Sequence, residues 1–170
     1  MKQVIKVTLS NEILKKISAI DENRFSLSTI EFPPMTKNRL RKNSKKKSSY
    51  ASNKIEGNPL TEKQADEVIE RDEHKHFLKP EQEIRNYFLA LNVLEEKLKA
   101  KEAFSKEMIL EVQAMVEKGA SKEKIGFRGP MPPGVLFAVY DSVTGVPEYI
   151  PPEYCDIPGL LDELVEYDFI

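Results

Sequence analysis

The stretch Pro80–Leu98, PEQEIRNYFLALNVLEEKL, decides the fold class of this sequence. Its apolar residues recur at intervals of three and four, the spacing that places side chains on one face of an α-helix. Proline suits the first turn of a helix, where its missing N–H is not needed. The stretch therefore predicts a long amphipathic helix with one face in the core. The core-facing residues are Ile84, Tyr87, Phe88, Leu91, Leu94 and Leu98.

Further helices are predicted on both sides of this stretch. Upstream, Thr61 and Gln64 form a capping box, which indicates a helix running to about Glu73. Downstream, Ser105 caps a helix that ends before Gly119. The side chains expected to face inward are Ala65, Val68 and Ile69 in the first of these helices, and Met108, Ile109, Val112, Met115 and Val116 in the second.

Residues 1–60 are predicted to form an N-terminal arm that precedes the main helical domain, residues 61–170. Within the arm, the weak apolar alternation of residues 2–9 favours a short strand or an extended segment. Ser10 or Asn11 caps a short helix, and we expect the proline-containing residues 21–36 to form a connection. The apolar side of the short helix carries Ile13, Leu14, Ile17 and Ile20.

A long, basic helix is predicted over residues 37–55, followed by Gly57 as a stop. Six cations fall within nine positions, namely Arg39, Arg41, Lys42, Lys45, Lys46 and Lys47. Such a run can neutralise the phosphates of a nucleic acid. No aromatic residue interleaves it and no DNA-binding motif surrounds it, so nucleic acid is the weaker interpretation. A solvated face, or contact with the acidic remainder of the protein, accounts for the run better.

The C-terminal part of the chain predicts a β-hairpin and one more helix. The segments VLFAVY (135–140) and VPEYI (146–150) flank the turn sequence DSVTG. Pro158 then begins a helix, and the sequence ends after barely three turns of it. We therefore expect a mainly α-helical, incomplete domain with one hairpin. Uncovered apolar faces would leave self-association open.

Composition narrows the class of protein. The 170 residues are 40% apolar and 32% charged, as in a soluble helical chain, and the net charge of -2 favours no partner. The single cysteine, Cys155, excludes an internal disulfide and fits a reducing compartment. No apolar run reaches the ~18 residues of a membrane span, and the N-terminus lacks a secretory signal. We expect a cytoplasmic protein that does not enter membranes.

The stretch Ser52–Asn58, SNKIEGN, carries the functional argument. Ser52 and Glu56 are four residues apart and lie on the same side of a helix. Glu56 falls in the last turn, where the helix dipole disfavours a negative charge by about 0.3–1 kcal/mol. Such a carboxylate needs a cation from elsewhere in the fold. On these residues alone, a solvated surface glutamate is an equally good interpretation.

This spacing resembles the inhibitory (S/T)xxxE(G/N) motif of Fic proteins in which the inhibitory helix precedes the Fic domain. The resemblance extends beyond six residues, covering about residues 35–167. The segments YASNKIEGNPL (50–60), FRG (127–129) and YIPP (149–152) follow one another in the order that this family uses.

The resemblance implies a function. Fic enzymes transfer AMP from ATP to a hydroxyl group of a target protein, with Mg²⁺ on the phosphates. The inhibitory glutamate, here Glu56 in a motif with Ser52 and Gly57, pairs with an arginine of the catalytic loop and occupies the space of the γ-phosphate; Asn58 would lie near the nucleotide. The hairpin matches the flap that docks the target by strand addition. The flap residues would be Arg128, Val135, Phe137, Val139 and Tyr149, with Arg128 anchoring the entry to the flap or remaining a plain surface charge.

The catalytic signature of that family, HPFx(D/E)GN, is absent from this sequence. We therefore expect no catalytic residue in the chain, no tight binding of ATP or Mg²⁺, and no AMP transfer by residues 1–170 alone. A second interpretation is a non-enzymatic module that lends Glu56 to a partner Fic domain, as antitoxins of the family do. A third is the basic nucleic-acid binder.

The sequence gives little support to a metal site. The cluster of acids and histidines near the end of the helix after Thr61 has a His-x-His pattern but no second set of ligands. Its members are better interpreted as surface residues at a helix end. They are Glu70, Asp72, Glu73, His74 and His76.

Overall fold

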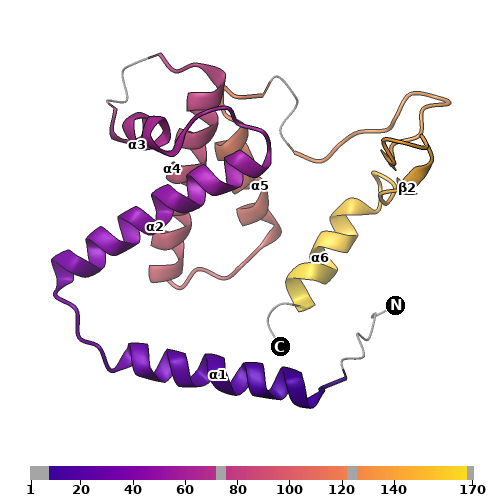
Figure 1. Cartoon of the computed structure of the whole chain (residues 1–170). Helices are drawn as coiled ribbons and strands as arrows, with labels where there is room; N and C mark the ends of the chain where they lie inside the picture. The colour runs from indigo at the N-terminus through magenta and orange to yellow at the C-terminus, as the bar shows by residue number, and fades with distance from the viewer. Residues whose placement is uncertain (1–7, 72–75, 122–125, 168–170) are drawn as a thin grey trace. The chain divides into compact units, whose positions relative to one another are not determined.

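A computed structural model describes residues 8–71, 76–121 and 126–167. This part of the chain is mainly helical, with six helices and one two-stranded antiparallel hairpin, as the sequence predicts (Figure 1). The chain divides into two compact units, Met1–Asn43 and Ser44–Ile170. None of the helices in the described ranges is both long enough and apolar enough to cross a bilayer.

The first helix, α1 (Asn11–Ser28), is longer than the sequence suggested. The side chain of Ser10 caps it, accepting a hydrogen bond from the backbone N–H of Ile13 at 3.3 Å. The prediction that residues 21–36 form a connection is wrong, because α1 continues to Ser28 and the next helix begins at Pro34. Proline fits the first turn of a helix, so the second proline of the pair starts a helix instead of preventing one. The expectation for residues 2–9 lies mostly outside the described residues.

Helix α2 (Pro34–Ile55) ends in a glycine stop of the kind expected. Gly57 has a φ of +86°, in the left-handed region. Its N–H donates to the carbonyl oxygen of Lys54 at 3.1 Å, and the N–H of Asn58 donates to that of Asn53 at 2.9 Å. These two bonds make a Schellman motif, which satisfies carbonyls at the end of the helix. Glu56 is the residue between the last helical residue and this glycine.

The core of the second unit forms where α4 (Lys79–Lys99) packs against α3 (Glu62–Glu70) on one side and α5 (Lys106–Glu117) on the other. The capping box, the proline start of α4 and the Ser105 cap are all confirmed. The prediction that Leu98 faces the core is wrong, because this side chain is 75% exposed. The buried apolar side chains are Ala65, Val68, Ile84 and Ala90.

Two buried polar side chains of α4 donate hydrogen bonds to the backbone carbonyls at the C-terminal ends of α3 and α5. The amide nitrogen of Asn86 donates to the carbonyl oxygens of Val116 and Lys118, at 2.8 and 2.7 Å, where α5 ends. The guanidinium of Arg85 donates to the carbonyl oxygen of Arg71 at 3.0 Å, where α3 ends. Carbonyls at a helix end lack partners within the helix, so these bonds tie the three helices together.

The hairpin is present but shorter than predicted. Strands β1 (Val139–Tyr140) and β2 (Pro147–Tyr149) pair antiparallel, with an irregularity between the two residues of β1. Pairing stays short because this irregularity breaks the register and because proline has no N–H to donate. Helix α6 (Ile157–Tyr167) follows and packs against α5, with an ion pair of 2.7 Å between Lys106 and Asp162.

Candidate functional site

Glu56 is exposed at the turn that follows α2. Its carboxylate makes no hydrogen bond or ion pair with any residue in the described ranges. The C-terminal end of a helix carries partial negative charge, so nothing local offsets the charge of this side chain. A guanidinium brought to this position would gain two charge-assisted hydrogen bonds from one carboxylate. The geometry of Glu56 therefore suits capture of a cation from elsewhere.

The backbone beneath Glu56 is fixed by α4. The hydroxyl of Ser52 donates to the hydroxyl oxygen of Tyr87 at 3.0 Å. One turn earlier, Ser49 is fully buried and donates to the carbonyl oxygen of Lys45 at 2.8 Å. Ser52 faces α4, whereas Glu56 stays in solvent. The expectation that the two side chains share one side of a helix is not met, because α2 ends at Ile55.

Asn58 anchors the turn, a role that the sequence did not reveal. It is 6% exposed, and its amide nitrogen donates to the carbonyl oxygen of Pro80 and to the carboxylate of Glu83, both at 2.9 Å. Its amide oxygen accepts the N–H of Leu60 at 3.1 Å. Both amide hydrogens are therefore used inside the chain. The expected proximity of Asn58 to a nucleotide stays a prediction.

Lysines of the basic run bind acidic side chains of α3 and α4. The ammonium of Lys45 lies 2.6 Å from the carboxylate of Glu95. The ammonium of Lys46 lies 2.9 Å from Glu70 and 3.7 Å from Asp66. The interpretation of the run as a surface that contacts the acidic remainder of the protein is confirmed for these two lysines. They are consequently less available to phosphates than a free basic face would be.

Arg128 closes the base of the hairpin. Its guanidinium donates to the carbonyl oxygen of Pro152 and lies 4.6 Å from the centroid of the Phe137 ring. A cation over an aromatic face is attracted by the negative potential of the ring. Arg128 therefore joins the segment that enters the hairpin to the segment that leaves it. This is the geometry of an anchor and not of a free surface charge.

The remaining predicted flap residues form an exposed apolar surface. Val139 and Tyr149 are paired across the two strands, and each is about half exposed, at 54% and 56%. Val135 and Phe137, expected within the first strand, lie before β1 because the regular pairing is short. Val135 is also about half exposed.

A carboxylate organises the turn of the hairpin. Asp141 accepts hydrogen bonds from the N–H groups of Thr144 and Val143, at 2.6 and 2.9 Å, and from the hydroxyl of Thr144 at 2.9 Å. These bonds, the one from the Thr144 N–H foremost, hold the pKa of Asp141 below its ordinary value. Gly145, with a φ of +67°, completes the turn.

The predicted site residues form two separate groups. One group surrounds Glu56 at the end of α2, and the other occupies the hairpin. No group of three or more acidic, histidine or cysteine residues in the described ranges is arranged to hold a metal ion. Part of the sequence cluster considered for a metal, including His74, lies outside those ranges.

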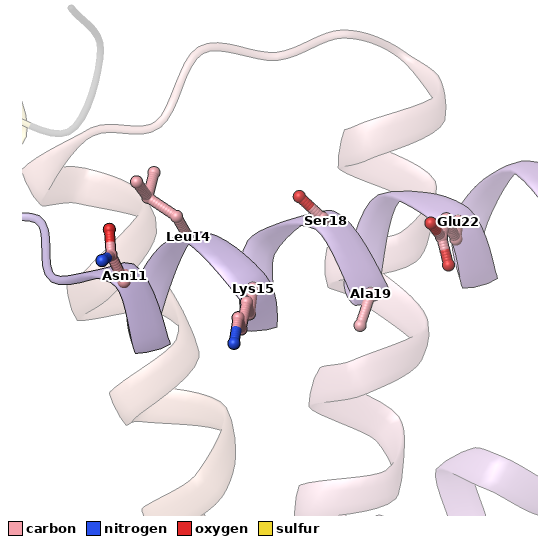
Figure 2. Close-up of a pocket in the computed structure, with 6 residues that line it drawn as sticks. All are labelled: Asn11, Leu14, Lys15, Ser18, Ala19 and Glu22. Carbon is pink, nitrogen blue, oxygen red and sulfur yellow. The ribbon is translucent and has the colours of Figure 1, made fainter.

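A surface hollow lies along α1, away from both groups in sequence (Figure 2). All of its lining side chains come from this one helix, and none belongs to the predicted site. They are Asn11, Leu14, Lys15, Ser18, Ala19 and Glu22. Another hollow lies between α4 and α5 and likewise contains no predicted site residue.

No protein-family model and no curated protein sequence matches this chain. Any functional interpretation therefore depends on the motifs and on the geometry of their residues.

Proposed function

We propose that this chain is the regulatory segment of a Fic-type protein adenylyltransferase, in which Glu56 restrains AMP transfer. One observation carries the proposal. An exposed carboxylate without a partner in the described ranges projects from a helix end that is fixed on both sides, by Ser52 on Tyr87 and by Asn58 on α4.

The restraint follows from charge. An arginine that holds the γ-phosphate of ATP is captured by the carboxylate of Glu56 through charge-assisted hydrogen bonds. The carboxylate also repels the phosphates from the space it occupies. The arginine belongs to the HPFx(D/E)GN loop region of the family, which residues 1–170 do not contain. ATP and Mg²⁺ would bind at that loop, so residues 1–170 contribute control of the reaction and none of its catalytic groups.

The hairpin supplies the second part of the proposal, a docking surface for the target protein. The apolar side chains of Val139 and Tyr149 are about half exposed on its two strands, which suits contact with an extended segment of the target added at an edge. Arg128 holds the base of the hairpin closed, so that this surface keeps its form before the target arrives.

The test is transfer of labelled AMP by the complete protein carrying Glu56→Gly. We expect transfer to rise roughly ten- to a hundredfold, because a hydrogen bond between charged groups is worth about 1.5–3 kcal/mol and the arginine is set free. Glu31→Gly is the control, since Glu31 is exposed in the connection between α1 and α2. Equal transfer by the native protein and by Glu56→Gly would contradict the inhibitory role.

A second candidate function is that of an antitoxin-like module, in which Glu56 binds the catalytic-loop arginine of a separate Fic protein. The absence of a partner for Glu56 within the described ranges favours this arrangement equally, because the carboxylate is accessible from outside. Residues 1–170 would then lower the activity of a separate Fic domain when added to it, and the Glu56→Gly chain would not. Inhibition in trans distinguishes an antitoxin-like module from a segment that acts only on its own chain.

A further inference from the structure

Polar contacts attach the C-terminal half of α2, residues 44–55, to α3 and α4. All residues of α2 are described, and Ser49 is the only one that is buried. Leu40 and Ile55 are 50% and 84% exposed, and Tyr50 is only partly buried. Burial of apolar surface, the main stabilising contribution in most packed helices, therefore contributes little here. Hydrogen bonds and ion pairs hold this helix in place.

The contacts at one end of the attachment are ionic. Lys45 binds Glu95 at 2.6 Å and the side-chain oxygen of Asn92 at 2.5 Å on α4, and Lys46 binds Glu70 at 2.9 Å on α3. The side chains of Lys45 and Glu95 are 23% and 26% exposed, that of Lys46 is 13% exposed, and that of Glu70 is 52% exposed. Salt screens such partly exposed ion pairs, although less than fully exposed ones. We call this set of contacts the ionic end.

The contacts at the other end are neutral or buried. Asn58 is 6% exposed and is bound to α4 through Pro80 and Glu83. Salt screens a buried contact far less than an exposed ion pair. Gly57 lies between Asn58 and the helix, with a backbone conformation that other residues avoid and with open space around it. Glycine at this position provides a natural pivot.

We propose that α2 is a hinged latch: its ionic end separates from α3 and α4 when the charges are screened or neutralised, while Asn58 keeps the other end attached. The role of the latch rests on the proposed function: opening would also break the hydrogen bond from Ser52 to Tyr87, and it would reorient Glu56 and weaken the restraint on AMP transfer. The physical basis is the contrast between partly exposed ionic contacts within α2 and a buried amide contact just beyond its C-terminal end.

Hydrogen exchange on the 170-residue chain tests the latch. Once detached, the lysine-rich helix loses the tertiary contacts from which most helical stability comes, so its amides exchange faster. In the Lys45→Gln, Lys46→Gln double variant, we expect exchange over residues 44–55 to rise about three- to tenfold, as exposed ion pairs of modest strength imply. Raising NaCl from about 0.05 M to about 0.5 M, which shortens the screening length severalfold, should do the same in the native chain.

Lys47→Gln is the matched control, because Lys47 lies on the same helix, carries the same charge and is exposed. Its exchange should equal that of the native chain. Amides of α3 and α4 should stay protected in every variant, since Val68 and Ile84 hold those helices by apolar burial. The latch is refuted if the double variant leaves exchange in α2 unchanged, or if α2, α3 and α4 all exchange faster together.

These outcomes are independent of enzymatic activity. If α2 opens with salt but Glu56→Gly leaves transfer unchanged, the latch stands and the proposed function falls. If α2 stays closed in the double variant while Glu56→Gly activates transfer, the restraint by Glu56 stands without a latch.

Discussion

Gly57 shows how one residue fixes the end of α2. Its φ of +86° costs an L-residue about 1–2 kcal/mol, and an added Cβ would meet no atom within 4 Å. Gly57→Ala should therefore lower the free energy of unfolding by about that amount, through backbone strain alone. Urea denaturation followed by circular dichroism measures it.

Gly159 is the comparison for this substitution. It lies inside α6, has no left-handed φ, and also has open space around its Cα. Alanine is the better helix former, so Gly159→Ala should raise the stability by up to about 1 kcal/mol. If both substitutions changed stability in the same direction, the strain assigned to Gly57 would be wrong.

The two residues after Glu56 differ in how far sequence could predict them. A glycine after a helical pattern indicates a left-handed stop, because that preference is local. The role of Asn58 was not predictable in this way, because its partners Pro80 and Glu83 lie 22 and 25 residues further along the chain. Only the packing of α4 beside the turn brings them within hydrogen-bond distance.

At the scale of elements, the hairpin should depend on pH through Asp141. The hydrogen bonds from Thr144 and Val143 lower its pKa, so the folded turn favours the ionised form. Their stabilising effect is fully present above the ordinary aspartate value of about 4 and is lost as pH falls through the lowered pKa. The amide proton of Thr144, followed by NMR, should keep its bonded chemical shift down to about pH 4 and lose it below.

Asp141→Asn provides the control for that titration, because the amide keeps an acceptor oxygen but carries no ionisable proton. Its Thr144 signal should not change over the same range. A midpoint at or above the ordinary aspartate value in the native chain would contradict the bonding assigned to this turn.

Helix starts that are set by hydrogen bonds between nearby residues could be predicted from the sequence. The end of α1 and the lengths of the hairpin strands could not. The Thr61–Gln64 box and the Ser105 cap each use partners within three residues, and both are present. The end of α1 was missed because Asp21 and Glu22 interrupt the apolar spacing, although neither residue breaks a helix. The hairpin strands were predicted too long because the irregularity beside Tyr140 has no sequence signature.

At the scale of the whole molecule, stability should be unevenly distributed. None of the residues of α1 is buried, whereas α3 and α4 share the apolar core around Val68 and Ile84. An isolated helix of this length is marginal in water. Amides of α1 should therefore exchange within the first minutes, and those of α3 and α4 far more slowly.

Protection in α1 equal to that in α4 would contradict this expectation. It would show that the apolar side of α1, around Ile17 and Ile20, is covered by another surface. Repeating the exchange at several protein concentrations tells whether that surface belongs to a second copy, since only self-association depends on concentration.

The anchoring of Asn58 gives α2 the properties of a lever. Glu56 lies two residues from the fulcrum, whereas Lys46 and Lys45 lie 12 and 13 residues from it, about 18–20 Å along a helix. If α2 rotates about Asn58 so that Lys45 and Lys46 move by several ångströms, the carboxylate of Glu56 changes its direction but hardly its position. A force applied far from the fulcrum would therefore change the direction in which Glu56 points, and a small torque there would suffice.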